Sequence, residues 1–323
     1  MKLNKLLPAL VALLLVLSLQ SILLSDRWLS SCILWKDEML DTVVHLLRCP
    51  VCHGPLCGGE GVLYCGLGHS HDVARQGYVS LFAPPGRVHT GDSARMIAAR
   101  ERFLGSGFYD PIAEAVVSEV LGALGLRRGR EGCVVDLGAG TGYYLARLLE
   151  ALPGWRGLAL DASAAALRRA ARANPRIGAV GCDVWRELPV ADGAVALVLD
   201  IFAPRNAAEI SRILEPDGVL IVVTARKDHL RPLSSLPGML SVEEDRPDQI
   251  EASLSKSFDP LRRRSLDFYI HTGRESALDA VMMGPSARHV EEEEVRRHLG
   301  SMPEPLKVEV SVEIMTLRRA EAL

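Results

Sequence analysis

Residues 133–142, which read CVVDLGAGTG, join an apolar segment to a glycine-rich turn and decide the fold that the sequence predicts. The apolar segment has the character of a buried strand, and Asp136 lies near its end. Gly138, Gly140 and Gly142 allow backbone amides to approach a ligand closely where a helix begins. Their spacing differs from the dinucleotide fingerprint, whose last glycine falls one residue later. The stretch therefore predicts a nucleotide-like ligand at the carboxyl end of a parallel sheet.

Strands and helices alternate after this turn as far as residue 224. Beyond a helix that ends at Leu149, strands are expected at 157–160, 179–182, 194–200 and 218–224, and helices at 164–173 and 207–214. Such alternation indicates parallel pairing through right-handed crossovers. The predicted fold class is therefore α/β, with a doubly wound, mostly parallel, Rossmann-like sheet.

Two further strand-like segments, 264–271 and 307–317, lie near the C-terminus with a helix between them. In the second segment, apolar residues such as Val308 and Val310 alternate with polar ones. A period of two is what an antiparallel edge strand shows. We therefore predict that residues 307–317 add an antiparallel edge strand to the sheet.

Cysteines gather in the front part of the chain. Cys49 and Cys52 form a Cys-x-x-Cys pair, and Cys65 and His69 follow after a gap of hairpin length. Three thiolates and one imidazole can close a tetrahedral zinc site, which stabilises a fold and leaves no open position for catalysis. A free redox pair is the alternative, but the second half-site favours zinc. Three neighbours are alternatives to His69 as the fourth ligand: Cys57, His53 and His71.

Acidic residues end the next predicted strands. Asp161 should accept hydrogen bonds from the ribose hydroxyls of a bound nucleoside, a task for an acceptor without a competing donor. Asp183 is placed to meet an adenine amino group. Each alone could be a helix cap or turn residue. Because Asp136, Asp161 and Asp183 fall at successive strand ends, a binding site is favoured.

The charge balance gives no overall attraction to nucleic acid, since 37 basic and 40 acidic residues leave a formal net charge of -3. Any RNA contact must therefore come from local clusters, although most charge runs are solvated faces. The arginine clusters are residues 127, 128 and 130, residues 168, 169 and 172, and residues 262–264.

The first 40 residues complicate the cellular location. Lys2 and Lys5 precede an apolar run from Leu6 to Leu24, which is typical of a signal peptide or a marginal membrane span. A metal-type cysteine cluster indicates a reducing compartment instead. We favour a cytoplasmic protein that starts at Met39, and keep a membrane anchor as the alternative.

Taken together, the glycine turn, Asp161, Asp183 and the Leu214–Gly218 turn resemble the class I methyltransferases that use S-adenosylmethionine. Further short motifs narrow this resemblance: Cys49-Pro-Val-Cys52, Cys65-x-x-x-His69, Gly77-Tyr78-Val79, Gly91-Asp92-Ser93-Ala94, Arg100, Phe103-Leu104, Phe108-Tyr109, Phe202-Ala203-Pro204-Arg205-Asn206, His229-Leu230 and Met283-Gly284-Pro285. Together they resemble the RlmA family of ribosomal RNA guanine-N1 methyltransferases.

The resemblance implies S-adenosylmethionine and structural zinc as cofactors and 23S ribosomal RNA as the partner, with the modified guanine in hairpin 35. One branch of the family confers resistance to macrolides of the tylosin type, and residues 202–206 look more like that branch. A homodimer is a further hypothesis. Residues 284–288 depart from the family because they lack a tryptophan, which bears on one wall of the base pocket.

These considerations divide the chain into four blocks. We expect a hydrophobic leader at 1–40, a zinc-binding RNA-recognition module at 41–83, a linker and helical connector at 84–128, and the methyltransferase domain at 129–323. Within the connector, helices are predicted at 93–104 and 111–126.

Predicted site residues follow from the same reading. The expected cofactor contacts are Asp136, Gly138, Gly140, Gly142, Tyr143, Asp161, Asp183, Leu188 and His229. Guanine N1 carries a proton at neutral pH, so Asp200, at the end of the fourth strand, is the candidate base, and a purely structural role is equally open. Phe202 is the candidate for stacking on an extruded guanine, with core packing as its alternative.

Two other functions share part of this pattern. A methyltransferase for a small quinone-like molecule would use every cofactor residue, but a freely diffusing substrate needs no separate recognition module. A noncatalytic RNA-binding or membrane-tethered protein could retain the fold. Failure to bind S-adenosylmethionine would identify that second alternative.

Overall fold

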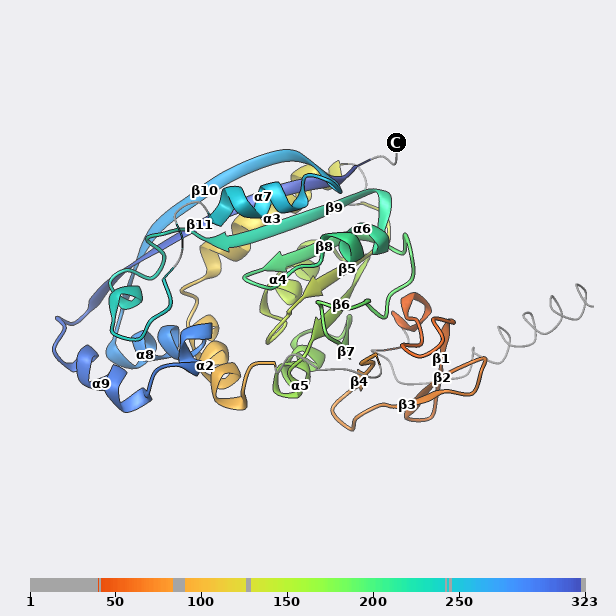
Figure 1. Ribbon diagram of the computed structural model, residues 1–323, viewed down its shortest axis with the longest axis horizontal. Helices are drawn as coiled ribbons and strands as arrows, with labels where there is room; N and C mark the ends of the chain where they lie inside the picture. The colour runs from red at the N-terminus through yellow and green to blue at the C-terminus, as the bar shows by residue number, and fades with distance from the viewer. Residues whose placement is uncertain are drawn as a thin grey trace, which may run out of the picture.

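The computed structural model describes residues 40, 42–83, 91–125, 129–241, 243 and 246–320 (Figure 1). The expected leader, apart from Leu40, lies outside the described residues, as do Arg127 and Arg128. Among the helices of the described ranges, none is long and apolar enough to cross a membrane.

A mixed sheet of eight strands organises the described chain. From one edge to the other its strands are β10 (Phe258–Thr272), β11 (Leu306–Arg319), β9 (Leu214–Ala225), β8 (Val195–Ile201), β5 (Gly132–Leu137), β6 (Trp155–Asp161), β7 (Ile177–Gly181) and β4 (Tyr78–Ser80). Neighbours from β9 to β4 pair in parallel, and β10 and β11 are antiparallel. The predicted α/β class with a doubly wound, mostly parallel sheet is confirmed.

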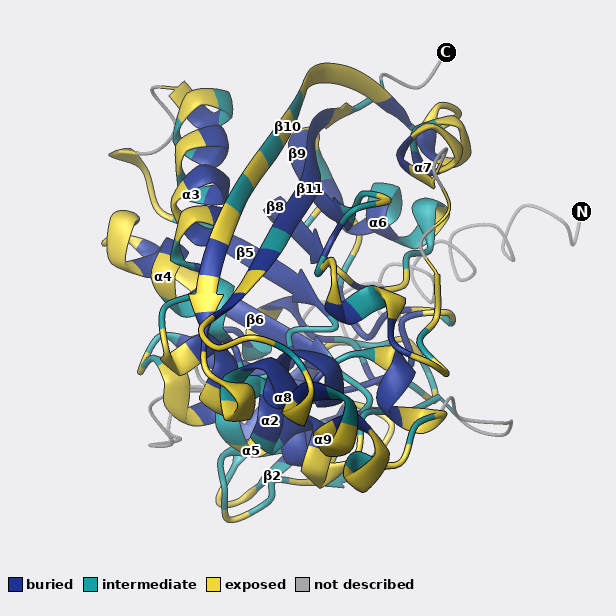
Figure 2. Ribbon diagram, turned by 90° about the vertical axis from the view of Figure 1, so that its left-hand side faces the viewer, coloured by how far each residue is buried: buried dark blue, intermediate teal, exposed yellow. Residues whose placement is uncertain are grey.

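Both faces of the central strands are buried, because successive side chains point to opposite sides of a sheet. Val134 of β5 packs into one apolar cluster and Val135 into the other. The first face is covered by α2 (Ala94–Gly105), α3 (Asp110–Leu124), α4 (Tyr143–Ala151), α5 (Ala164–Ala173), α8 (Arg274–Met282) and α9 (Glu292–Gly300). The second is covered by α6 (Ala207–Ile213), α7 (Arg246–Leu254) and the front module (residues 42–83). Figure 2 shows the central strands enclosed between these layers.

Three helices begin where the sequence supplies a capping side chain. Ser93 and Ser163 accept a hydrogen bond from the third backbone amide beyond them, each at 3.3 Å, and Asn206 does so at 3.4 Å. Such caps satisfy a backbone donor that has no partner inside the helix. They fix the starts of α2, α5 and α6, and therefore the loops that leave the carboxyl ends of the strands.

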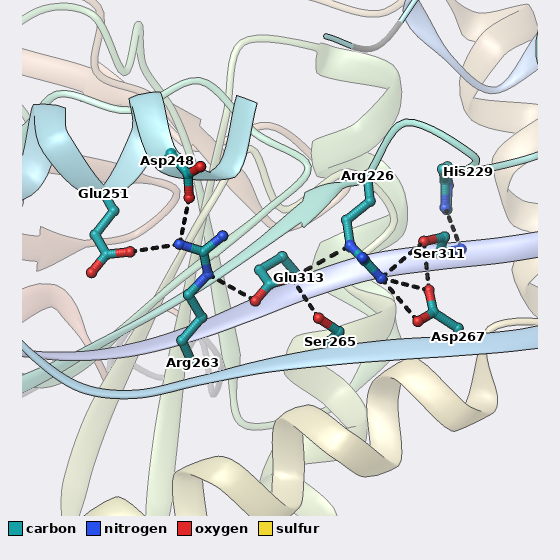
Figure 3. Close-up of polar contacts among 9 residues, drawn as sticks. All are labelled: Arg226, His229, Asp248, Glu251, Arg263, Ser265, Asp267, Ser311 and Glu313. Atoms are coloured by element: carbon teal, nitrogen blue, oxygen red, sulfur yellow. Dashed lines mark hydrogen bonds and ion pairs between the residues drawn. The ribbon is translucent and has the colours of Figure 1, made fainter. Parts of the chain in front are cut away.

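One strand differs from its expected position. Residues 307–317 lie in β11, which pairs with β9 on one side and β10 on the other, so the prediction that they form the edge strand is wrong. The antiparallel edge strand is β10 instead, and the yellow segments of its ribbon in Figure 2 mark its exposed residues. The polar residues of β11 face hydrogen-bonding partners instead of an open edge. Glu313 accepts from Arg263 Nε at 2.9 Å, and Ser311 donates to Asp267 at 2.6 Å (Figure 3).

The front module contains a three-stranded antiparallel sheet of β1 (Leu56–Gly59), β2 (Val62–Cys65) and β3 (Ser70–Asp72), preceded by the 3-10 turn η2 (Val44–Leu46). Strand β4 then leaves this small sheet and pairs with β7 of the large one. At the other end of the module, Arg48 N donates to Pro189 O at 3.0 Å and Ala191 N donates to Leu46 O at 2.8 Å. The module is therefore held against the large domain at two places.

Candidate functional site

The glycine turn after β5 adopts backbone angles that favour glycine. Gly138, Gly140 and Gly142 have φ angles of 62°, 56° and 76°. A Cβ atom added to Gly138 would lie 2.8 Å from the Cβ of Ala203, which is closer than real side chains pack. The turn is therefore tight, and its backbone can approach a ligand closely, as a nucleoside-binding loop requires.

Asp161 ends β6 directly beside this turn. Its Oδ2 accepts from Gly140 N at 2.9 Å and its Oδ1 from Ser163 N at 2.7 Å. Burial raises the pKa of Asp161, and these two amide hydrogen bonds oppose the rise. The carboxylate is thus fixed in orientation, and each oxygen keeps a further lone pair for a ligand hydroxyl.

Three carboxylates come together at the carboxyl ends of β5, β6 and β8: Asp136 and Asp200 are buried, and Asp161 is half-buried. Asp136 is fully buried, and its pKa is raised by burial and by the charges of Asp161 and Asp200. Mutual repulsion of this kind favours a ligand that brings positive charge. S-adenosylmethionine carries a sulfonium and an ammonium group, so its charge fits this set of residues.

Asp200 has a strong partner that the sequence reading did not assign. Arg205 Nε donates to its Oδ2 at 2.7 Å, and Arg205 Nη2 lies 3.4 Å from its Oδ1. Asp200 is completely buried. Burial raises the pKa of its carboxyl group to about 6, although the Arg205 charge lowers it. The group is therefore ionised at neutral pH, with a higher proton affinity than an exposed aspartate.

Phe202 protrudes beside this pair. It has a φ of 54°, which is rare for a bulky residue, and its side chain is 41% exposed. Its ring centroid lies 6.2 Å from that of Tyr109 and 5.5 Å from that of His229. An exposed aromatic ring held in a strained turn suits stacking on a flat ligand.

His229 is buried and hydrogen-bonds to two other parts of the chain, Ser311 of β11 and Tyr109. Its Nδ1 accepts from Ser311 N at 3.3 Å, so the ring proton belongs on Nε2, which lies 2.9 Å from the Tyr109 hydroxyl. Burial lowers the pKa of His229 to about 4, so the imidazole is neutral. Because Nε2 then donates to Tyr109, the hydroxyl proton of Tyr109 is available to another acceptor. Tyr109 appeared in the sequence only as part of a motif.

Arg100 is a second site residue without a role assigned from sequence. Its Nη2 donates to Asp92 Oδ2 and to Met283 O, each at 2.6 Å. A Cβ atom added to Gly140 would lie 3.1 Å from its Nη1. Arg100 therefore extends from α2 over the glycine turn, a placement that only the tertiary fold reveals.

The remaining residues predicted to contact the cofactor are Asp183, Leu188 and Tyr143. Asp183 is buried and its Oδ1 accepts from Trp185 N at 3.1 Å. The buried Leu188 donates its backbone amide to Glu209 at 2.7 Å. The Tyr143 hydroxyl instead donates to Asp110 of α3. The structure thus brings Asp136, Asp161 and Asp200 together, whereas the Tyr143 side chain is held by the helical connector.

The four predicted metal ligands converge in the front module. Ligand atoms of Cys49, Cys52, Cys65 and His69 all lie within 4.8 Å of one another. The Sγ atoms of Cys52 and Cys65 are 3.5 Å apart, and Cys65 Sγ lies 3.3 Å from His69 Nδ1. Tetrahedral zinc with bonds of about 2.0–2.3 Å requires separations of roughly 3.5–3.8 Å between ligands, so the cluster fits zinc.

The chemistry of these ligands also suits a metal. Burial opposes ionisation of Cys65, yet hydrogen bonds from the backbone amides of Leu67 and His69 and from Cys52 lower the pKa of its thiol to about 6. A thiolate is the form that binds zinc. His71 is a close neighbour, with Nε2 at 3.6 Å from Cys49 Sγ, but it lies outside the four-residue cluster.

Comparison with known proteins agrees with this geometry. A family model described as "Methyltransferase domain" matches residues 134–218, and one described as "RlmA, N-terminal" matches residues 47–84. The chain is 41% identical over 280 residues to the 23S rRNA (guanine(748)-N(1))-methyltransferase of Streptomyces fradiae, covering 87% of this chain and 99% of that protein.

Two further relatives carry provisional names for 23S rRNA (guanine-N(1)-)-methyltransferases. A Micromonospora griseorubida protein is 43% identical over 294 residues, which cover 86% of this chain and 98% of the relative. A Bacillus subtilis protein is 32% identical over 196 residues, 57% of this chain and 66% of the relative. The first of these matches, like that to the Streptomyces protein, spans both the front module and the sheet domain.

Proposed function

This chain belongs to the RlmA-type 23S rRNA (guanine-N1)-methyltransferases, and we propose that it transfers a methyl group from S-adenosylmethionine to N1 of a guanine in hairpin 35 of 23S ribosomal RNA. The observation that carries this proposal is that one chain joins a four-residue cluster of metal ligands to a sheet whose carboxyl edge holds the glycine turn and three neighbouring carboxylates. We take the guanine to be the counterpart of the position named for the Streptomyces fradiae relative.

The residues of this site have distinct tasks. The sulfonium of S-adenosylmethionine supplies an already electrophilic methyl group, so the protein mainly has to position the acceptor. Asp161 would hold the ribose hydroxyls, and Asp183 would meet the adenine. The exposed ring of Phe202 would stack on the guanine. The N1 edge of the guanine would face the Asp200 carboxylate and neighbouring carbonyl oxygens.

We assign proton removal to Asp200. Methylation of N1 breaks the N1–H bond, and the proton must pass to an acceptor as the N1–methyl bond forms. A carboxylate with a pKa near 6 is ionised at neutral pH and accepts a proton more readily than an ordinary aspartate. Arg205 would stay paired with the carboxylate and hold it in place.

The proton-acceptor role predicts a pH profile. The folded pKa of Asp200 is raised, so the group is protonated below about pH 6 and ionised above it. The single-turnover methylation rate should therefore rise about tenfold per pH unit below pH 6 and level off above it. In Asp200→Asn this acid limb should vanish, with the plateau lower by about a hundredfold or more. Asp259→Asn, an exposed carboxylate on β10, is the control.

The binding of S-adenosylmethionine to Asp200→Asn must be measured in parallel. Normal cofactor binding with a lost rate and a lost acid limb supports the assignment. A rate and profile that survive in this variant would show that Asp200 only orders the turn with Arg205.

The test of the function is the mapping of the modified nucleotide. Purified protein, S-adenosylmethionine and an unmodified 23S transcript containing hairpin 35 should give one N1-methylguanine, detected by a primer-extension stop and by mass spectrometry of nucleosides. Replacing the target guanine with adenine should remove the product. Methylation of a small quinone-like acceptor and not of RNA would overturn the proposal, as would failure to bind the cofactor.

Two finer expectations accompany this function. Expression in a tylosin-sensitive host should raise tylosin tolerance if the chain belongs to the resistance branch. An rRNA substrate and thiolate ligands also favour the cytoplasm as the place of action. The homodimer stays a prediction.

A further inference from the structure

A hollow on the helical face of the large domain is lined by arginines. It has a volume of about 680 Å³ and lies between α2, α4 and α5. Arg147 of α4 and Arg168, Arg169 and Arg172 of α5 line it, together with Thr141 of the glycine turn. The wall of this hollow therefore begins within the turn that forms the cofactor cradle.

A second hollow continues from the first toward the front module. It has a volume of about 550 Å³, and Arg75 and Gln76 in the loop between β3 and β4 line it. Arg172 lines both hollows. Helix α5 contacts α2 on one side and β4 on the other (Figure 1). The two hollows therefore adjoin each other along α5, on one side of the molecule. We call this surface the basic groove; it comprises Arg75, Arg147, Arg168, Arg169 and Arg172.

Three arginines of the basic groove carry uncompensated charge. Arg169 pairs with Glu101 at 2.7 Å, and Arg147 pairs with Asp110 at 2.8 Å. Within the described residues, no ion pair within 4.0 Å is formed by the other three, which are all exposed: Arg75, Arg168 and Arg172.

Several arginines outside the groove are paired with carboxylates. Arg263 contacts Asp248, Glu251 and Glu313, and Arg226 contacts Asp267 and Glu313 (Figure 3). The groove differs in that three exposed arginines without an ion pair among the described residues, Arg75, Arg168 and Arg172, line two adjoining hollows.

We propose that the basic groove binds the sugar-phosphate backbone of the RNA substrate, running from the front module to the cofactor turn. This inference rests on the proposed function and specifies where its substrate lies. Arg168 and Arg172 are one helical turn apart and share a face of α5, so they present two charges in a row to one strand. The guanidinium group of arginine can donate two parallel hydrogen bonds to phosphate oxygens. Such contacts position an RNA without depending on its base sequence.

Salt-dependent binding tests the proposal. Affinity for a hairpin 35 transcript would be measured by fluorescence anisotropy at several KCl concentrations, for wild type and Arg168→Ala/Arg172→Ala. Each phosphate contact contributes a slope of about 0.7–0.9 in the plot of log affinity against log salt. The variant should lose about 1.5 from the slope and bind roughly tenfold to hundredfold more weakly at low salt.

Two matched variants separate the groove from general charge effects. Arg297→Ala/Arg318→Ala removes the same number of charges from exposed positions outside the groove and should leave the slope unchanged. Arg168→Lys/Arg172→Lys keeps both charges and should restore most of the slope. Affinity for S-adenosylmethionine should be the same in all variants, since none of these side chains belongs to the cofactor contacts.

The outcomes distinguish this proposal from the proposed function. If wild type methylates the transcript while the alanine variant keeps the full slope, the groove is not the RNA path and the function stands. If wild type binds RNA through the groove but methylates no guanine, the function fails and the groove stands. An equal loss in the control pair, or binding of wild type to anionic lipid vesicles and not to RNA, would contradict the groove.

Discussion

Gly138→Ala is expected to weaken the binding of S-adenosylmethionine strongly. Gly138 has a φ of 62°, and an added Cβ would lie 2.8 Å from the Cβ of Ala203, so the turn must shift. A residue other than glycine in this conformation costs about 1–3 kcal/mol, and displacement of the cradle adds to that loss. Calorimetric titration should show affinity reduced by about a hundredfold, which corresponds to about 2.7 kcal/mol.

Gly193→Ala is the matched control for this change. Gly193 has a φ of 58°, so alanine meets a similar backbone penalty, but the nearest atom to its Cβ is Leu214 O at 3.9 Å. Gly193→Ala should lose about 1–2 kcal/mol of unfolding free energy, and Gly138→Ala should lose more because of the contact with Ala203. Only Gly138→Ala should lose cofactor affinity. Equal cofactor affinities in the two variants would mean that this turn does not hold the ligand.

Loss of zinc is expected to unfold the front module. Metal binding supplies on the order of 10 kcal/mol of folding free energy in small zinc domains. His69→Ala removes one of four ligands and should lower zinc affinity by on the order of a hundredfold or more. The zinc content after dialysis against a weak chelator should fall below one per chain, and trypsin should cut the variant at Arg75. Methylation of RNA should be lost.

His71→Ala is the control because His71 lies beside the cluster without belonging to it. Its Nε2 is 3.6 Å from Cys49 Sγ, so the substitution perturbs the same surroundings. This variant should retain zinc, protease resistance and activity. If His71→Ala lost zinc and His69→Ala retained it, His71 and not His69 would be the fourth ligand.

Parts of the fold could be predicted because local signals agreed with tertiary packing. The bounds of α5 match the prediction residue for residue, since Ser163 caps the helix and its apolar residues recur with helical spacing. Helix α7 was missed because only Pro247, Ile250 and Leu254 of its nine residues are buried, which leaves little periodic signal. The prediction that residues 307–317 form the edge strand was wrong. Alternating polar and apolar residues indicate that one face of a strand is polar, but they do not indicate which strands pair with it.

The site divides in the same way. Asp136, Asp161 and the glycines could be predicted because they lie in one short stretch or at strand ends. Arg205, five residues from Asp200, could have been suspected as its partner from the salt-bridge spacing across the turn. Arg100 and Tyr109 could not be placed, because their contacts with Met283 and His229 depend on how distant helices and strands meet.

Strand β4 has a consequence for how this enzyme can be divided or recombined. Its three residues occupy the outer rim of the sheet and cover the backbone groups of β7 that would otherwise face solvent. An uncovered rim of this kind is a template for aggregation. A shortened protein that begins after residue 83 would therefore be prone to self-association, so the front module and the sheet domain should be kept together when the enzyme is recombined.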